Sequence, residues 1–346
     1  RADGCTVLNF AIPRASCTFG AIPSLPPSME VFIDGRSAAA TLHCHLSKGF
    51  SLPRPVQLLL LLLSGYCLDD FLAEAQGLTA GTSHACSLQK GTRAAICWGW
   101  DRDGQVSNGP VGERYQSLSA GARHTCGLRE SDGTVVCWGT EQNGVTTAPA
   151  GRFIALEAGY WHNCALRPDK TAKCWGSNTF GMATPPEGVR FSSIAAGSSQ
   201  TCGIVEEDSS IVCWGKTDTG SPPEDQYLSV SVGEYHACAI RKSNNTAVCW
   251  GLDHYGQCDA PQGLRFSDIV AGGDHSCGIR MSDNTVFCWG LNSDGQGHPP
   301  QDQRFSTLVA GVYHTCGARI PDQATICWGR TDDGQVEVPS EHEWEL

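Results

Sequence analysis

Apolar and polar residues alternate in short runs over most of the chain, and the runs end at turn-forming residues. The segment RFSDIVAG (265–272) alternates and ends at a glycine. HSCGIRM (275–281) and TVFCWGL (285–291) lie on either side of the polar residues SDN, which is the pattern of a β-hairpin. Helical periodicity is absent from this region. The pattern therefore predicts three short strands, of which the second and third form a hairpin.

This three-strand pattern is repeated seven times. The tripeptide CWG recurs at spacings of 36 to 40 residues and begins at Cys97, Cys137, Cys174, Cys213, Cys249, Cys288 and Cys327. A unit of this size cannot bury both of its faces alone, so the repeats predict an all-β, seven-bladed β-propeller over residues 76–346. An open solenoid is the alternative, but it would need polar caps at both ends. The terminal residues favour closure: PSEHEWEL places Trp344 where Phe305 stands in the preceding copy, and GLTAG at 77–81 supplies the remainder of that strand.

Two cysteines occur in every repeat, with the predicted turn midway between them. Folding at the turn brings the two cysteines opposite each other, as a disulfide requires. In the third copy the spacing falls from 11 to 10 residues, and the turn absorbs the change. Zinc is the alternative, but its ligands favour shorter cysteine spacing and four ligands at one metal. One disulfide per blade is therefore predicted, with the pairs Cys86–Cys97, Cys126–Cys137, Cys164–Cys174, Cys202–Cys213, Cys238–Cys249, Cys277–Cys288 and Cys316–Cys327.

Residues 1–75 differ in pattern from the repeats, and we interpret them as a low-order leader. Arg54 precedes a short apolar run, 56–63, and AEA at 73–75 offers small residues for cleavage. Residues 56–75 therefore resemble a secretory signal peptide, with a leucine-rich core helix as the alternative. Disulfides also require an oxidising compartment, so we expect a secreted protein without a stable membrane anchor. The sequon at Asn244, in a predicted hairpin turn, would then be open to glycosylation.

Composition narrows the classes of partner. The formal net charge is −12, which disfavours binding to nucleic acid. No catalytic motif is recognised, so we expect a monomeric, non-enzymatic protein without a cofactor or metal. Five of the 19 cysteines stand outside the predicted pairs, namely Cys5, Cys17, Cys44, Cys67 and Cys258.

Three recurring features have a structural and a functional interpretation. Six repeats carry a histidine before the first cysteine, and the fourth carries Gln200 there. Glutamine is a poor zinc ligand, so hydrogen bonding is favoured over a metal site. The CWG tryptophans are assigned to packing between blades, with a light-sensing tryptophan cluster as the alternative. The Asp-Gly loops are assigned to turns, with calcium loops as the alternative.

The positions that vary between copies are the candidates for binding. Two residues between AG and the histidine are free to vary, and they include aromatic and arginine residues of the types enriched at binding hot spots. Equivalent positions on seven blades share one rim. This first set contains Arg123, Tyr160, Trp161, Tyr235 and Tyr313. A second set follows CWG and contains Trp100, Phe180 and Tyr255. Scattered surface aromatics are the alternative interpretation.

The recurring pattern F-x-x-hydrophobic-x-A-G-x-x-H-x-C-G-L-R … C-W-G-x-N-x-x-G-Q resembles the regulator of chromosome condensation repeat over about residues 76–346. The short repeats are similar to beta-lactamase inhibitor protein II of the same superfamily. The paired cysteines and CWG are similar to the ectodomains of CRINKLY-type plant receptor kinases. The resemblance implies a seven-bladed propeller and, from the inhibitor branch, a protein-binding face made of variable loops.

The sequence thus predicts a secreted, disulfide-stapled propeller that binds a protein partner through its variable rim loops, as an inhibitor or a receptor-ectodomain-like module. An extracellular propeller that binds or processes glycans is the alternative. A pair of carboxylates in a central cleft would favour the glycan-processing alternative, whereas a flat aromatic rim would favour protein binding.

Overall fold

The chain divides into two compact units, Arg1–Leu68 and Asp69–Leu346. The computed structural model describes residues 8–11, 31–32, 39–42, 77–216, 220–320 and 322–339. In the first unit, β1 (Leu8–Ala11), β2 (Val31–Phe32) and β3 (Ala39–Leu42) form an antiparallel sheet in the order β1-β3-β2, which the sequence did not predict. The predicted signal segment 56–75 lies outside the described residues, as do Cys5, Cys17, Cys44, Cys67 and Trp344.

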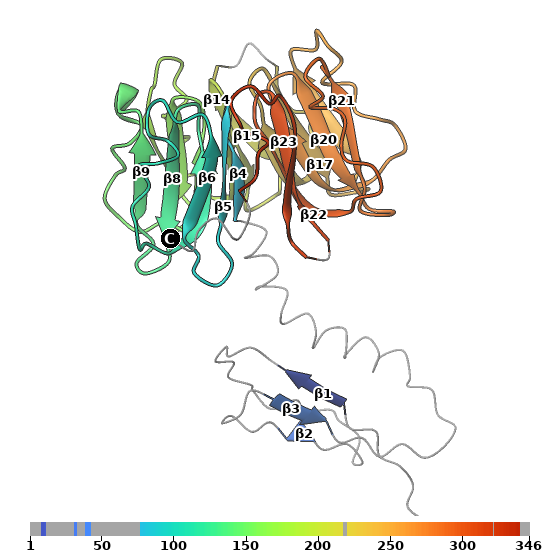
Figure 1. Cartoon of the computed structure of the whole chain (residues 1–346). Helices are drawn as coiled ribbons and strands as arrows, with labels where there is room; N and C mark the ends of the chain where they lie inside the picture. Colours follow the sequence, from blue (N-terminus) through green and yellow to red (C-terminus); the bar gives the residue numbers. More distant parts are fainter. Residues whose placement is uncertain are drawn as a thin grey trace, which may run out of the picture. The chain divides into compact units, whose positions relative to one another are not determined.

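The second unit contains seven three-stranded antiparallel sheets, each built from consecutive strands (Figure 1). The first strand of each sheet lines the central channel, and these strands are β4 (Leu78–Ala80), β7 (Tyr115–Ala120), β10 (Ala155–Ala158), β13 (Phe191–Ala196), β16 (Tyr227–Val232), β19 (Phe266–Ala271) and β22 (Phe305–Ala310). The middle strands are β5 (His84–Leu88), β8 (His124–Arg129), β11 (His162–Leu166), β14 (Gln200–Val205), β17 (His236–Arg241), β20 (His275–Arg280) and β23 (His314–Arg319). The outer strands are β6 (Ala95–Gly99), β9 (Val135–Gly139), β12 (Ala172–Gly176), β15 (Ile211–Gly215), β18 (Ala247–Gly251), β21 (Val286–Gly290) and β24 (Thr325–Gly329).

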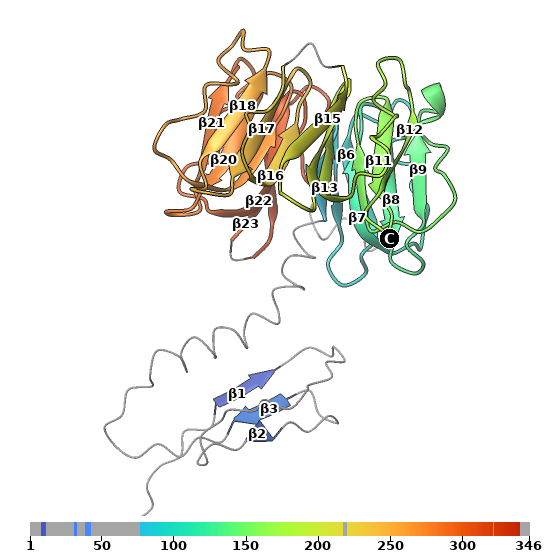
Figure 2. The same ribbon diagram turned by 180° about the vertical axis from the view of Figure 1, so that it is seen from behind.

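These sheets are the seven blades of a β-propeller, numbered 1 to 7 in chain order, so the predicted fold class is confirmed (Figure 2). Within the described residues the helical structure is limited to a short 3₁₀ turn, η2 (Gln142–Gly144). None of the described helices has the length and apolar character needed to cross a membrane.

All seven predicted disulfides are present, one in each blade. Each joins directly opposed residues of the middle and outer strands, such as Cys277 and Cys288, with Cα atoms 4.0 Å apart. Cys164 and Cys174 are paired in the same way, so the shortened turn does absorb the missing residue. Cys258 is the free cysteine among the described residues, and burial raises the pKa of its thiol to about 12.

The glycine of each AG pair allows the inner strands to meet around the axis. A Cβ on Gly81 would lie 2.2 Å from the carbonyl oxygen of Gly121 in the next blade, which is far too close for a real contact. The same crowding occurs between the last and first blades, where a Cβ on Gly311 would lie 2.3 Å from the Gly81 oxygen. The Trp98 Nε1 also donates to the Gln335 carbonyl oxygen at 3.0 Å. The first and last repeats are therefore neighbours, and the ring is closed.

The CWG tryptophans pack between blades, as predicted. Trp175 of blade 3 lies in one apolar cluster with Cys126 and Leu128 of blade 2. Trp98 of blade 1 likewise clusters with Cys316 of blade 7. Six of the seven indole nitrogens donate to backbone carbonyls in the loops that join the blades. Each tryptophan thus covers the disulfide of the preceding blade and holds the loop beside it.

The six recurring histidines are buried between blades, and the Nε2 atoms of five of them are hydrogen-bonded, as the sequence favoured. Their partners lie on the next blade: the Nε2 of His84 is 2.9 Å from the Thr125 hydroxyl, and that of His275 is 2.8 Å from the Thr315 hydroxyl. Alanine takes the place of this hydroxyl residue on two blades. Ala237 holds the position of Thr125 on the blade after Gln200, and Ala85 holds it on the blade after His314. Within the described structure neither ring nitrogen of His314 has a hydrogen-bond partner. In five blades the histidine therefore links its own blade to the next one by a side-chain hydrogen bond.

We expect acid to destabilise the propeller through these histidines. Burial lowers the pKa of His84 and His275 to about 3, and that of His124, His162, His236 and His314 to about 4. Unfolded histidine titrates near pH 6.5, so the stability from these neutral rings is complete above about pH 6.5 and is lost as the pH falls toward 4. Denaturant unfolding at a series of pH values measures this loss. His314→Gln, which copies Gln200, removes one titrating ring, so this variant is expected to lose less stability between pH 6.5 and 4 than the wild type does. A wild-type stability that stays the same between pH 6.5 and 4 would contradict the account.

Candidate protein-binding face

The variable residues meet at one end of the propeller, which we call the loop face. It consists of the loops between the first and second strands and the segments that follow the third strands. In every blade the residue after CWG donates its backbone N–H to the carbonyl of the second variable position, as Trp100 does to Ser83 at 2.9 Å. The hairpin turns between the second and third strands lie at the opposite end, which we call the turn face (Figure 1). Both predicted sets of binding residues therefore belong to the loop face.

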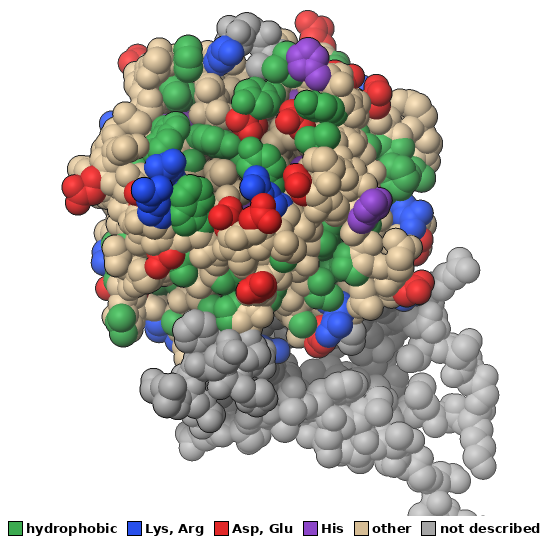
Figure 3. Space-filling view, turned by 45° about the horizontal axis from the view of Figure 1, so that its top comes forward, with side chains coloured by type: hydrophobic (Ala, Val, Ile, Leu, Met, Phe, Trp, Pro, Cys, Tyr) green, Lys and Arg blue, Asp and Glu red, His purple; other side chains and the backbone are tan. Residues whose placement is uncertain are grey.

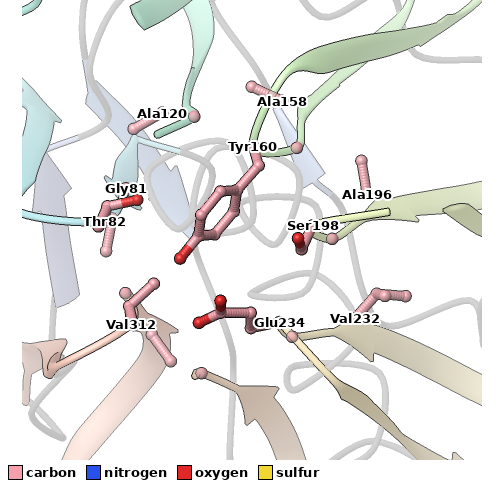
Figure 4. Close-up of a pocket in the computed structure, with 18 of the residues that line it drawn as sticks. Gly81, Thr82, Ala120, Ala158, Tyr160, Ala196, Ser198, Val232, Glu234 and Val312 are labelled. Atoms are coloured by element: carbon pink, nitrogen blue, oxygen red, sulfur yellow. The ribbon is translucent and has the colours of Figure 1, made fainter. Parts of the chain in front are cut away.

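The two variable positions of a blade differ in their surroundings. The first position lines the mouth of the central channel, where the residues include Thr82, Tyr160, Glu234 and Val312. Figure 4 shows the Tyr160 side chain extending across this mouth, with the Glu234 carboxylate pointing into the same space. The remaining cavity is about 60 Å³, well below the 300–1,000 Å³ of typical ligand pockets. Burial and the nearby Glu234 carboxylate raise the pKa of Tyr160.

The second position contributes to a cluster that joins three blades. The guanidinium carbon of Arg123 in blade 2 lies 5.6 Å from the ring centroid of Trp100 in blade 1. It also lies 6.0 Å from the ring centroid of Trp161 in blade 3, and its Nη1 is 3.8 Å from an Asp103 carboxylate oxygen. Cation–π contacts of this kind contribute about 0.5–1 kcal/mol each when partly exposed. The cluster Trp100–Arg123–Trp161 thus holds two indole rings in place before any partner binds.

Tyrosines occupy the second position on blades 5 and 7. Tyr235 is 41% exposed, and a hydrogen bond with Glu234, followed by burial, raises the pKa of its hydroxyl to about 12. Tyr313 lies under Arg330, whose guanidinium carbon is 5.2 Å from the ring centroid. A second cavity of about 100 Å³ lies between blades 4 and 5 and is lined by Glu234, Tyr235 and Leu252, among others. Glu234 therefore borders both the channel mouth and this second cavity.

Phe180 and Tyr255 are the most exposed of the predicted site residues, at 51% and 55%. Both lie in segments after third strands and outside the cluster around Arg123. The Lys216 ammonium lies 5.9 Å from the Phe180 ring centroid, which links blades 3 and 4. Green hydrophobic side chains on this face lie among red acidic and blue basic ones (Figure 3).

Sequence reasoning missed four residues of this face: Glu234, Asp103, Lys216 and Arg330. Glu234 occupies a first variable position, but glutamate is not among the aromatic and arginine residue types that indicate a binding hot spot. Lys216 and Arg330 directly follow CWG, as Trp100 does, so their place in the repeat was an available signal.

The loops that contain the Asp-Gly pairs are organised by side-chain hydrogen bonds. Asp101 Oδ1 accepts from the N–H groups of Val106 and Ser107, at 2.8 and 3.0 Å. In the equivalent loop of blade 5, which has no Asp-Gly pair, Asp253 Oδ1 accepts from Cys258 N–H at 2.8 Å in the same way. No group of three metal-ligating side chains occurs within the part of the chain that is described. The acidic residues of these loops thus act as turn formers, as the sequence favoured.

The repeat of this chain matches a known family model, and its fold is similar to that of solved structures. The regulator of chromosome condensation (RCC1) repeat model matches residues 115–145, 153–181, 228–257 and 266–296. The ectodomain of the receptor kinase CR4 from Physcomitrella patens is 28% identical with a TM-score of 0.66, over 73% of each chain. The CRINKLY ectodomain of the Arabidopsis thaliana receptor kinase ACR4 is 27% identical with a TM-score of 0.63, over 73% of this chain and 95% of that one.

Saccharomyces cerevisiae Prp20p, whose binding to Gsp1p and histones has been described, shares the fold at 17% identity and a TM-score of 0.60, over 79% of this chain and 86% of its own. A comparison with curated protein sequences gave no match. The chain is thus a disulfide-stapled propeller in which four segments match the RCC1 repeat model, and it is similar to the CR4 and ACR4 ectodomain propellers and shares the fold of Prp20p.

Proposed function

We propose that this protein is secreted and binds another protein through its loop face. The observation that carries the proposal is the Trp100–Arg123–Trp161 cluster, which three different blades contribute. Tryptophan and arginine are the residue types most enriched at binding hot spots. The fold does not require these residues, because other blades carry serine or aspartate in place of Arg123 and Trp161, and threonine or serine in place of Trp100. A binding function explains why such side chains gather here.

The compartment follows from the disulfides and the relatives. Seven disulfides form and persist in an oxidising environment. The similar propellers of CR4 and ACR4 are receptor ectodomains. We therefore place the protein outside the cell, as a monomer that acts as an inhibitor or as a receptor-ectodomain-like module.

The loop face supports protein binding better than glycan processing. Glycosidases generally use two carboxylates on either side of the scissile bond. Among the described residues that line the central channel, Glu234 supplies the carboxylate, and the cavity of about 60 Å³ is small. The aromatic residues are instead spread over several blades, as a broad protein interface would require.

Capture of the partner tests the proposed function. The wild-type protein, Arg123→Ala and Met281→Ala are immobilised and exposed to extracellular material from the source organism. Arg123→Ala removes the centre of the cluster, so it is expected to lose the specific partner. Met281 is 51% exposed on the turn face and serves as a matched control, which should retain the partner. Retention by Arg123→Ala, or loss by Met281→Ala, would contradict binding at the loop face.

A further inference from the structure

Six of the seven hairpin turns of the turn face share one hydrogen-bonding arrangement. In five blades an aspartate oxygen accepts the backbone N–H two residues further on, and these aspartates are Asp132, Asp169, Asp208, Asp283 and Asp322. Blade 5 has Asn244 in their place. Its Oδ1 accepts from Thr246 N–H at 3.0 Å and from the Thr246 hydroxyl at 2.8 Å. The asparagine therefore fulfils the same role in the turn as the aspartates.

The exchange of aspartate for asparagine creates the sequon Asn244-Asn245-Thr246. Asn244 is exposed, as are Lys242 and Ser243 before it. The turn occupies the Oδ1 atom, whereas no hydrogen bond from the Nδ2 atom occurs within the described structure. Asn245 adopts a φ of 60°, so the chain turns sharply at the tip of the hairpin. The nitrogen that would carry a glycan is thus free on an exposed turn.

We propose that Asn244 is an N-glycosylation site and that its glycan covers part of the turn face. The Nδ2 atom forms a bond to the anomeric carbon of an oligosaccharide carried on a lipid diphosphate. The bond from that carbon to the diphosphate oxygen breaks, the lipid diphosphate leaves with the electron pair, and the amide loses a proton to a base. No oxidation or reduction takes place. The inference rests on the proposed secretion, because this donor is met in the secretory pathway.

The position of the glycan bears on partner binding. The turn between β17 and β18 lies at the opposite end of blade 5 from Glu234 and Tyr235. A bulky, solvated glycan there blocks a protein from docking on that part of the turn face and leaves the loop face open. Enzymatic removal of the glycan is therefore expected to change partner affinity by less than about twofold.

The test expresses the full chain in eukaryotic cells and measures the intact mass of the secreted protein before and after treatment with peptide N-glycosidase. The wild type should lose the mass of one glycan. Asn244→Asp should show no shift and should melt as the wild type does, because five other turns carry aspartate there. Thr246→Ser keeps the sequon and should remain glycosylated.

Each contrary result has a distinct meaning. Secreted wild type without a glycan would overturn the glycosylation proposal and leave the proposed export intact. A glycan that persists in Asn244→Asp would overturn the assignment to this residue. A chain that stays in the cytosol would overturn both the glycosylation proposal and the proposed export.

Discussion

Replacing Trp161 with alanine is expected to weaken partner binding by about 2 kcal/mol or more, which is about 30-fold in Kd. Trp161 is one side of the cluster that contains Arg123, so its loss removes an aromatic contact surface and one of the two cation–π contacts of the guanidinium. The fold should be unaffected, because the equivalent residues Ser83, Ser199 and Asp274 occur in other blades. Calorimetric titration with the captured partner gives the change in affinity.

The control for Trp161→Ala is Met281→Ala, which removes an exposed apolar side chain from the turn face. Its Kd and melting temperature should match those of the wild type. If Trp161→Ala unfolds the protein or binds the partner as tightly as the wild type does, Trp161 is not part of the interface.

Replacing Trp138 with alanine is expected to reduce the free energy of unfolding by about 3–5 kcal/mol. Trp138 is 5% exposed and packs with Cys86 of blade 1 and Tyr115 of blade 2. Its Nε1 donates to the Gln105 carbonyl oxygen at 3.0 Å. The substitution therefore leaves a cavity between two blades and removes the hydrogen bond to the loop that joins them. Denaturant unfolding at neutral pH measures the loss.

Trp100→Ala is the matched control, because Trp100 lies on the loop face and is not part of a CWG tripeptide. Its unfolding free energy should fall by less than about 1 kcal/mol, which is the contribution of an exposed cation–π contact. Similar losses in Trp100→Ala and Trp138→Ala would show that the CWG tryptophans have no special role between blades.

The repeat made most of the fold predictable. Seven copies determine the number of blades, and the midway turn determines the disulfide pairs, as the shortened copy with Cys164 and Cys174 shows. Both features follow from local geometry, since a hairpin necessarily brings these positions together. The short strands β1, β2 and β3 were not predicted, because their segments carry no clear alternation.

The arrangement of the candidate site was less accessible from sequence. Tyr160 and Trp161 are adjacent in the chain, yet Tyr160 covers the channel mouth and Trp161 contacts Arg123. The three residues of the cluster are separated by more than 20 positions each, so their contact depends on how neighbouring blades pack. The histidines show the same limit. Gln200 replaces histidine within its own repeat, whereas the hydrogen-bond partners of the histidines, such as Thr125 for His84, lie on the next blade.

Hydrogen–deuterium exchange of the protein with and without its captured partner tests the central claim most directly. The account predicts slower exchange in the complex over residues 82–84, 100–104, 122–124, 160–162 and 234–236, which belong to the loop face. Exchange in the turn-face residues 130–134 and 281–285 should be unchanged. Protection of the turn face, with exchange at the loop face unaltered, would contradict the account.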